Sequence, residues 1–168
     1  MELKIKHISP YLSYHVKFIN DSYDQPLIVG GLNINYKKVQ NILRENTFDL
    51  SDIKLVLRPL SDLTKEILVN GKKIIPLIEL AKLSFKKWDH DCFSLAYENH
   101  VVFGTYYFSY DKKEMSFDCK RDYDGQKWDY NCYVPFQLEL FNKLLEWHFD
   151  VFELIKNNLA IDINTLNK

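Results

Sequence analysis

The chain is poor in residues that interrupt regular structure, and it lacks the long apolar segments that a membrane requires. Its 168 residues include only 5 glycines and 5 prolines, which argues against long flexible linkers. No stretch approaches the roughly 20 consecutive apolar residues of a membrane-spanning helix. Charged and apolar residues are interleaved over 1–12, so a signal-peptide core is missing as well. We therefore predict a single domain, 1–168, in the cytoplasm and with no membrane partner.

Cysteine and histidine are too scattered for a disulfide framework or a zinc site. The cysteines, Cys92, Cys119 and Cys132, are odd in number and contain no CxxC pair, so we expect reduced intracellular thiols. No HExxH motif or zinc-finger spacing occurs. His90 and Cys92 would share one face of a strand, but two ligands do not complete a site. The sequence predicts no metal and no other cofactor.

The usual signatures of catalysis are also missing. The chain has no GxGxxG, P-loop or GxSxG motif, which removes the common signals for nucleotide binding and serine hydrolysis. His148 and Asp150 suggest a dyad, yet residues two apart on a helix point about 200° away from each other. We interpret His148 as a core histidine, and Asp150 as an N-cap if the helix breaks near Phe149. We predict no catalytic residue and expect that the protein is not an enzyme.

The clearest pattern in the chain is amphipathic and covers residues 135–158. Stepping at about 100° per residue separates a polar arc from a wide apolar face. The polar arc holds Glu139, Lys143, Glu146, Asp150, Glu153 and Asn157. The apolar face holds Leu138, Phe141, Leu145, His148, Phe152, Ile155 and Leu159. Pro135 suits the first turn and Asn157-Asn158 the end, so the pattern predicts a long helix that covers a sheet.

Residues 92–134 provide the predicted sheet. Runs rich in aromatic and β-branched residues, at 101–110, 115–121 and 127–134, are separated by short polar turns. Such runs are typical of an antiparallel meander. The predicted fold class is α+β, with an antiparallel β-meander over 92–134 covered by a long C-terminal helix over 135–158.

The N-terminal part predicts a mixture of short strands and helices. Alternating residues at 2–8 indicate a strand, and Ser61 with Asp62 indicates the start of a helix over 61–68. Asn70-Gly71 fits either a type I′ hairpin turn or a left-handed helix C-cap. We favour the C-cap, because the preceding residues already have a helical pattern.

Aromatic residues are abundant, at 15% of the chain, and suggest a binding surface. Trp, Tyr and Arg are the usual anchors of protein interfaces. Trp88 and Trp128 each follow a lysine and precede an aspartate, which suggests partial exposure, with an ordinary core or edge-strand tryptophan as an equal alternative. Arg58 precedes Pro59 and could hold a phosphate or a carboxylate, or form a structural ion pair. Together with Tyr123, these three residues are the predicted partner-binding candidates.

Charge is distributed unevenly along the chain. Residues 1–88 carry 14 Lys/Arg and 9 Asp/Glu, whereas residues 89–168 carry 8 and 14. A basic half can bind nucleic acid. Two solvated faces that simply differ in net charge would give the same asymmetry. The aromatic runs lie among acidic residues, which disfavours stacking on nucleic acid. We expect a protein partner, with a nucleic-acid-associated protein using the basic N-terminal half as the alternative.

Two parts of the chain resemble the signature stretches of a protein family. They are LRPLSDLTKEI at 57–67, and EWHFDVF at 146–152 followed by LAIDIN at 159–164. The family consists of small uncharacterised proteins encoded by bacteriophages and prophages. The resemblance implies a phage accessory protein in the cytoplasm of a bacterial host cell. Such a protein would bind a host or phage protein, for example as an inhibitor of a defence system such as CRISPR. The family pattern has glycines where this chain has Glu153 and Asn157-Asn158.

Overall fold

The computed structural model shows two compact units. It describes residues 2–23, 25–33, 38–41, 46–87, 92–96, 100–123 and 126–166, with the backbone alone at 33, 122, 123 and 126–131. Unit 1 contains Met1–Leu60 and Leu144–Lys168, and unit 2 contains Ser61–Lys143. Unit 1 therefore combines both ends of the chain. The single domain stays a prediction, since two compact units can still unfold as one cooperative domain.

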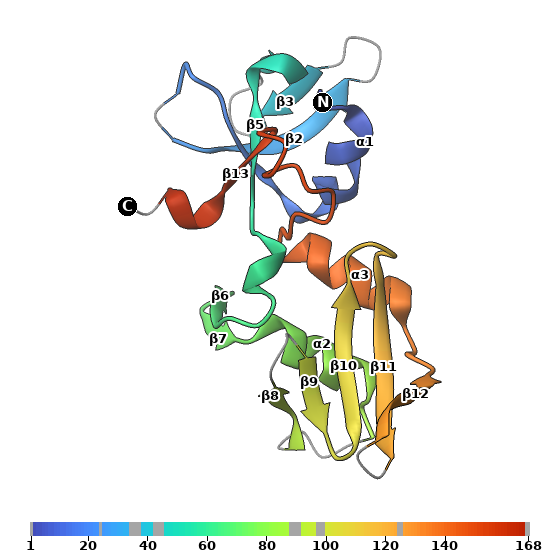
Figure 1. The fold of residues 1–168 in the computed structure, drawn as a ribbon. Coiled ribbons are helices and arrows are strands. Elements are labelled where there is room, and N and C mark those ends of the chain that lie inside the picture. Colours follow the sequence, from blue (N-terminus) through green and yellow to red (C-terminus); the bar gives the residue numbers. More distant parts are fainter. Residues whose placement is uncertain are drawn as a thin grey trace. The chain divides into compact units, whose positions relative to one another are not determined.

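Unit 1 is built on a six-stranded sheet with the strand order β13-β5-β1-β2-β3-β4 (Figure 1). Its strands are β1 (Lys17–Ile19), β2 (Leu27–Asn33), β3 (Lys38–Asn41), β4 (Thr47–Asp49), β5 (Lys54–Leu57) and β13 (Ala160–Asp162). Its helical segments are α1 (Ile5–Ile8), η1 (Ser9–Tyr14), η2 (Leu50–Asp52) and η5 (Ile163–Thr165). β13 pairs with β5 in parallel, and the other neighbours are antiparallel. The C-terminal segment thus completes a sheet that the N-terminal residues begin.

One face of this sheet belongs to the core of unit 1. Phe18 and Ala160 both pair with Leu55, from opposite sides, so these three side chains share a face. All three are buried. Ile19 and its partner Lys54 lie on the opposite face and are half-buried. β1 therefore alternates between an interior face and a more accessible one, whereas in β5 Val56 is buried although it lies on the same face as Lys54.

Unit 2 contains a five-stranded antiparallel sheet in the order β12-β11-β10-β9-β8 (Figure 1). Its strands are β8 (Ser94–Ala96), β9 (His100–Phe103), β10 (Tyr106–Asp111), β11 (Ser116–Tyr123) and β12 (Gln126–Cys132). Phe103, Phe108 and Phe117 are buried on one face, and the rings of the last two stack 5.5 Å apart. α2 (Pro76–Ser84) packs against β9 and β10. This aromatic layer is the core of unit 2.

Three predictions for the N-terminal half are wrong. Asn70-Gly71 forms the turn of a hairpin between β6 (Ile67–Val69) and β7 (Lys72–Ile74), not a helix C-cap. Both residues have positive φ, 49° and 78°, as a type I′ turn requires. The expected helix over 61–68 is only the short η3 (Leu60–Asp62) followed by β6. Residues 2–8 were predicted to form a strand, but they contain the single-turn helix α1 instead.

The predicted fold class is wrong in its main element, because the chain has no long C-terminal helix. α3 (Gln137–Glu146) ends after 10 residues, and turns occupy most of the segment between it and β13. His148, Glu153 and Asn158 have φ values of 58°, 55° and 58°, which a right-handed helix does not contain. The described residues contain mostly strands and three short α-helices.

Hydrogen bonds to distant segments replace those of the predicted helix. The N–H of Arg58 donates to the carbonyl of His148, and the N–H of Asp150 donates to the carbonyl of Arg58, both at 2.8 Å. The Tyr11 hydroxyl donates to the carbonyl of Phe149 at 2.6 Å. The Phe149 side chain is fully buried. The apolar residues that have helical spacing in this part of the sequence therefore belong to an irregular segment, and that segment pairs with the backbone of Arg58.

Candidate functional site

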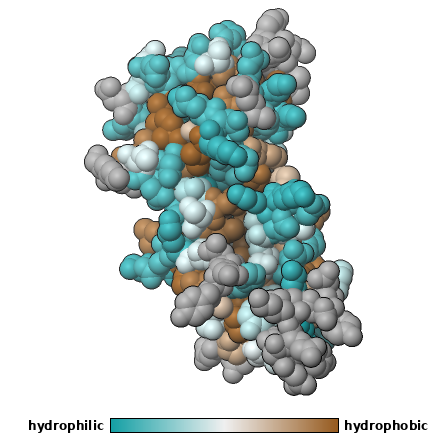
Figure 2. Space-filling model, in the orientation of Figure 1, coloured by the Kyte–Doolittle hydropathy of each residue, from teal (hydrophilic) through white to brown (hydrophobic). Residues whose placement is uncertain are grey.

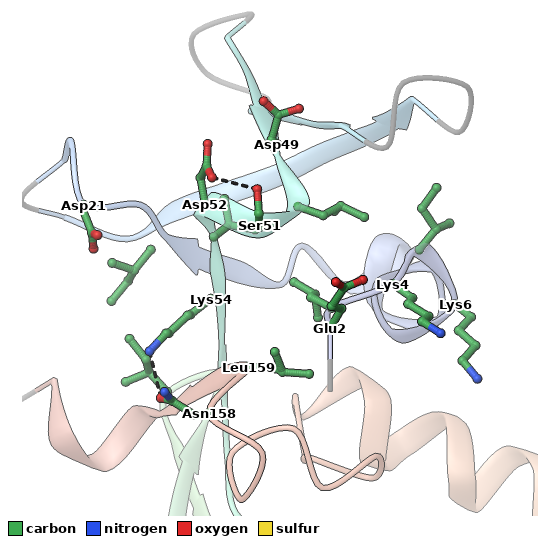
Figure 3. Close-up of a pocket in the computed structure, with 16 residues that line it drawn as sticks. Glu2, Lys4, Lys6, Asp21, Asp49, Ser51, Asp52, Lys54, Asn158 and Leu159 are labelled. Atoms are coloured by element: carbon green, nitrogen blue, oxygen red, sulfur yellow. Dashed lines mark hydrogen bonds between the residues drawn. The ribbon is translucent and has the colours of Figure 1, made fainter.

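Unit 1 contains a cavity of about 1000 Å³ that is open to solvent (Figure 3). It is lined by residues from the segments 2–6, 49–54 and 158–161, together with Ile19 and Asp21. This volume is at the upper end of the range typical of ligand pockets. Four parts of the chain that are far apart in sequence therefore form one concave surface.

The floor of the cavity is apolar and belongs to the accessible face of the sheet. Ile19 on β1 and Ile161 on β13 point to the face opposite Phe18 and Ala160. Leu159, which directly precedes β13, lies on the same side as Ile161 and appears in the middle of the close-up (Figure 3). Figure 2 shows hydrophobic residues gathered on the visible face of unit 1 and bordered by hydrophilic ones. The floor can therefore hold an apolar group.

Three aspartates form an acidic wall, labelled Asp21, Asp49 and Asp52 in Figure 3. The buried side chain of Asn20 holds two of them in place, since it donates to the carbonyl of Asp52 at 2.8 Å and accepts from the N–H of Ser22 at 3.0 Å. Asp49 has a loose ion pair with Lys38 at 3.9 Å. The carboxylates at 21 and 52 are exposed. They are therefore available to a cation.

The N-terminal segment brings two lysines, Lys4 and Lys6, and one carboxylate, Glu2, to the cavity, and we call it the basic wall for its excess of lysines (Figure 3). Leu3 is buried and anchors this segment, whereas both lysines are exposed. A third lysine, Lys54, lies on the floor beside its strand partner Ile19, apart from Lys4 and Lys6, and donates to the side-chain carbonyl of Asn158 at 2.8 Å (Figure 3). Among the described residues, no oppositely charged side chain lies within ion-pair distance of Lys4, Lys6 or Lys54. The basic wall can therefore accept an anion.

The arrangement is suited to binding an extended ligand with charge at both ends. Asp21 and Asp52 have no basic residue within ion-pair distance in the part of the chain that the structure describes. A ligand with a cationic group, an apolar middle and an anionic group would complement the acidic wall, the floor and the basic wall. In the cavity the Ser51 hydroxyl donates to the carboxylate of its neighbour Asp52 at 2.8 Å, and both residues are exposed (Figure 3). No histidine lies among the described residues that line the cavity, so this pair lacks the usual base of a hydrolytic triad.

Of the residues predicted to bind a partner, only Arg58 has a described side chain, and it is not among the residues that line this cavity. Trp88 lies outside the described residues, and only the backbone is described for Trp128 and Tyr123. Arg58 is half-buried in unit 1, where its backbone forms a parallel bridge with Phe149. The backbone of Arg58 therefore has a structural role, and the binding roles of all four residues stay predictions.

Asp150 and His148 do not form a dyad on a helix, since no helix contains them. The Asp150 carboxylate accepts from the N–H groups of Leu154 and Ile155, both at 2.8 Å. It therefore caps a turn, which matches the alternative of a chain that breaks near Phe149. Burial raises the pKa of Asp150, and hydrogen bonds from the N–H groups of Ile155, Leu154 and Phe152 partly oppose this shift.

His148 lies with Nε2 2.7 Å from the carbonyl oxygen of Tyr14, an arrangement in which Nε2–H donates. Burial lowers the pKa of His148 below its usual 6.5, although the bond to Tyr14 opposes the shift, and the charge of Arg58 lowers it further. The neutral form therefore stabilises the fold fully above pH 6.5. Below that pH the unfolded chain takes up a proton first, so the stabilisation is lost as pH falls.

We expect His148→Gln to weaken this pH dependence while lowering stability by about 1 kcal/mol at pH 8. Urea unfolding of both proteins at pH 8 and pH 5.5 measures the effect. The loss of stability on acidification must be compared between wild type and variant, because burial also lowers the pKa of His7, which is present in both proteins. Equal losses of stability on acidification in wild type and variant would contradict the assignment.

Among the exposed apolar side chains of unit 2, three lie close together in sequence and were not predicted to bind a partner. Tyr133, Phe136 and Leu138 are 84%, 50% and 73% exposed. The Lys86 ammonium lies 5.0 Å from the centre of the Phe136 ring. The helical pattern placed Leu138 on the covered face, and the structure corrects this. Helical spacing alone does not show which residues of an apolar helix face extend past the sheet and stay exposed.

Within the described ranges, no helix is long and apolar enough to cross a membrane. Nor do three His, Cys, Asp or Glu side chains in those ranges come together as a metal site. Comparisons with protein-family models, curated proteins and solved structures found no match.

Proposed function

We propose that the protein acts by binding and that the cavity of unit 1 takes an extended peptide segment of a protein partner. The observation that carries the proposal is the placement of an apolar floor between an acidic and a basic wall. A peptide with a Lys or Arg, one or two apolar residues and an Asp or Glu would complement all three surfaces. The free charges at Asp21, Asp52, Lys4 and Lys6 would then gain partners.

Preformed walls favour binding of this kind. Asn20 fixes the acidic wall by hydrogen bonds, and the buried Leu3 anchors the basic one. Little ordering of the protein is then needed when the ligand enters, which lowers the entropic cost of association. The exposed charges contribute mainly to orientation and partner choice, whereas the apolar floor contributes most of the affinity.

The resemblance to phage-encoded proteins supplies the setting of the proposal. The partner is a host or phage protein in the cytoplasm of a bacterial cell, and occupying it inhibits a defence system. The protein therefore works in stoichiometric amounts and without turnover. The alternative, a nucleic-acid-associated protein, draws on the basic N-terminal half, yet a phosphate chain at Lys4 and Lys6 would also approach the aspartates of the opposite wall.

A peptide library tests the proposal against this alternative. Purified protein is incubated at about 0.15 M salt with octapeptides of random sequence, and with single- and double-stranded DNA oligonucleotides, and binding is followed by fluorescence anisotropy. We expect enrichment of peptides that combine a basic residue, apolar residues and an acidic residue, with dissociation constants in the micromolar range. Binding of DNA together with a library that shows no enrichment would overturn the proposal in favour of the alternative.

A further inference from the structure

Two of the three cysteines lie opposite each other in the sheet of unit 2. Cys119 in β11 pairs directly with Cys132, the last residue of β12. Directly paired residues in antiparallel strands point to the same face, with Cα atoms about 4.5–5.5 Å apart. That spacing lies within the range over which disulfides join two Cα atoms.

The two thiols are in contact and differ in exposure. A side-chain hydrogen bond links Cys119 to Cys132. Cys119 is buried beside Phe108, its partner on β10, whereas Cys132 is half-buried on the edge strand. Burial and the neighbouring thiol raise the pKa of Cys119 to about 12, so it is protonated at neutral pH. Cys132 is thus the thiol that a reagent reaches first.

We propose that Cys119 and Cys132 form a redox site that small disulfides, such as oxidised glutathione, convert reversibly into a cross-strand disulfide. The Cys132 thiolate attacks one sulfur of the reagent, forms a mixed disulfide and releases one reagent thiolate. The Cys119 sulfur then loses its proton, attacks the Cys132 sulfur and releases the second reagent thiol. One reagent disulfide is reduced to two thiols for each protein disulfide formed.

The position of the pair gives the bond a structural consequence. β12 is an edge strand, and the chain leaves it at Cys132 to reach the exposed Tyr133 and Phe136. A disulfide would fix this strand end to β11. The Cβ atoms of paired strand residues are about 4.5–5.5 Å apart, slightly more than a relaxed disulfide prefers, so the bond is strained and easily reduced. The reduced state expected inside a cell and the oxidised state are therefore both reachable.

Oxidation of the full chain tests the proposal. Reduced protein is treated with oxidised glutathione, unreacted thiols are blocked with a maleimide, and the digested protein is examined by mass spectrometry. We expect a peptide pair linked through Cys119 and Cys132, with neither cysteine carrying glutathione, and its loss on treatment with dithiothreitol. Cys92→Ser removes the exposed third thiol and should form the same link at the same rate.

Cys132→Ser supplies the second arm, because it leaves the buried Cys119 in place. In this variant Cys119 should stay a thiol under conditions that oxidise the wild type, with the rate of its modification falling at least tenfold. Three results would overturn the proposal. They are glutathione held on Cys132 beside a free Cys119, both thiols remaining free, or unchanged oxidation of Cys119 in Cys132→Ser.

Discussion

Replacing Asp150 with alanine is expected to lower the free energy of unfolding by about 3 kcal/mol. The side chain is only 5% exposed, and its two oxygens each accept one backbone N–H, from Leu154 and Ile155. Alanine would leave both donors without an acceptor, and the bond to Leu154 is buried. Each unsatisfied buried donor costs about 1–3 kcal/mol. The same turn positions Leu159 on the cavity floor, so ligand binding should weaken as well.

Chemical denaturation of wild type, Asp150→Ala and Asp150→Asn measures this effect. Asparagine keeps one acceptor oxygen, and its loss should be about half that of alanine. Glu153→Gln is the matched control, because it removes an exposed carboxylate from the same segment and should change stability by less than about 0.5 kcal/mol. An alanine variant as stable as this control would show that Asp150 does not hold the turn.

The strands of unit 2 could be located from the sequence, and their order follows from short connections. β11 and β12 lie within or close to two of the predicted runs, whereas the run at 101–110 divides into β9 and β10 around Gly104, a turn that was not predicted. Alternation with a period of two is strong evidence where short polar turns separate the runs. Phe108 and Phe117 show the result, since each points to the core from its own strand.

The predicted long helix failed because residues 147–159 satisfy their backbone through tertiary contacts that spacing does not reveal. Arg58 and Tyr11 bond to carbonyls of this segment, and Asp150 bonds to its N–H groups. Glu153 and Asn158 adopt positive φ, which costs a non-glycine residue about 1–2 kcal/mol, less for asparagine. A glycine at either place would have signalled the break. The residues present continue a helical pattern instead.

The cavity could not be predicted, because no local pattern connects its walls. Lys4 and Asp52 are brought together only by the pairing of β1 with β5 and by the packing of the N-terminal segment. The sequence analysis selected aromatic residues such as Trp88 and Trp128, which are typical of interfaces but have no described side-chain position. Charged residues on opposite sides of an apolar floor give no signal before the fold is known.

Reversing the acidic wall is expected to have the largest effect on binding. In Asp21→Lys/Asp52→Lys, both carboxylates that would meet the cationic group of the peptide become ammonium groups. The peptide's cationic group is then repelled instead of attracted. This repulsion acts beside an apolar floor, where water screens charges less than in bulk solvent. We expect affinity for a library-selected peptide to fall by tenfold to a hundredfold at ~0.15 M salt, or about 1.4–2.8 kcal/mol. The loss should be larger at low salt.

Titration calorimetry of that peptide against three proteins tests the central claim, which is that the cavity of unit 1 binds a charged, extended segment. The proteins are the wild type, the double variant and Glu114→Lys/Asp118→Lys, which makes the same change of charge on unit 2. We predict one peptide bound per wild-type chain, a tenfold or greater loss in the unit 1 variant and less than threefold change in the unit 2 control. Equal affinity in the wild type and the unit 1 variant, with a loss confined to the unit 2 variant, would contradict the claim and place the binding surface on unit 2.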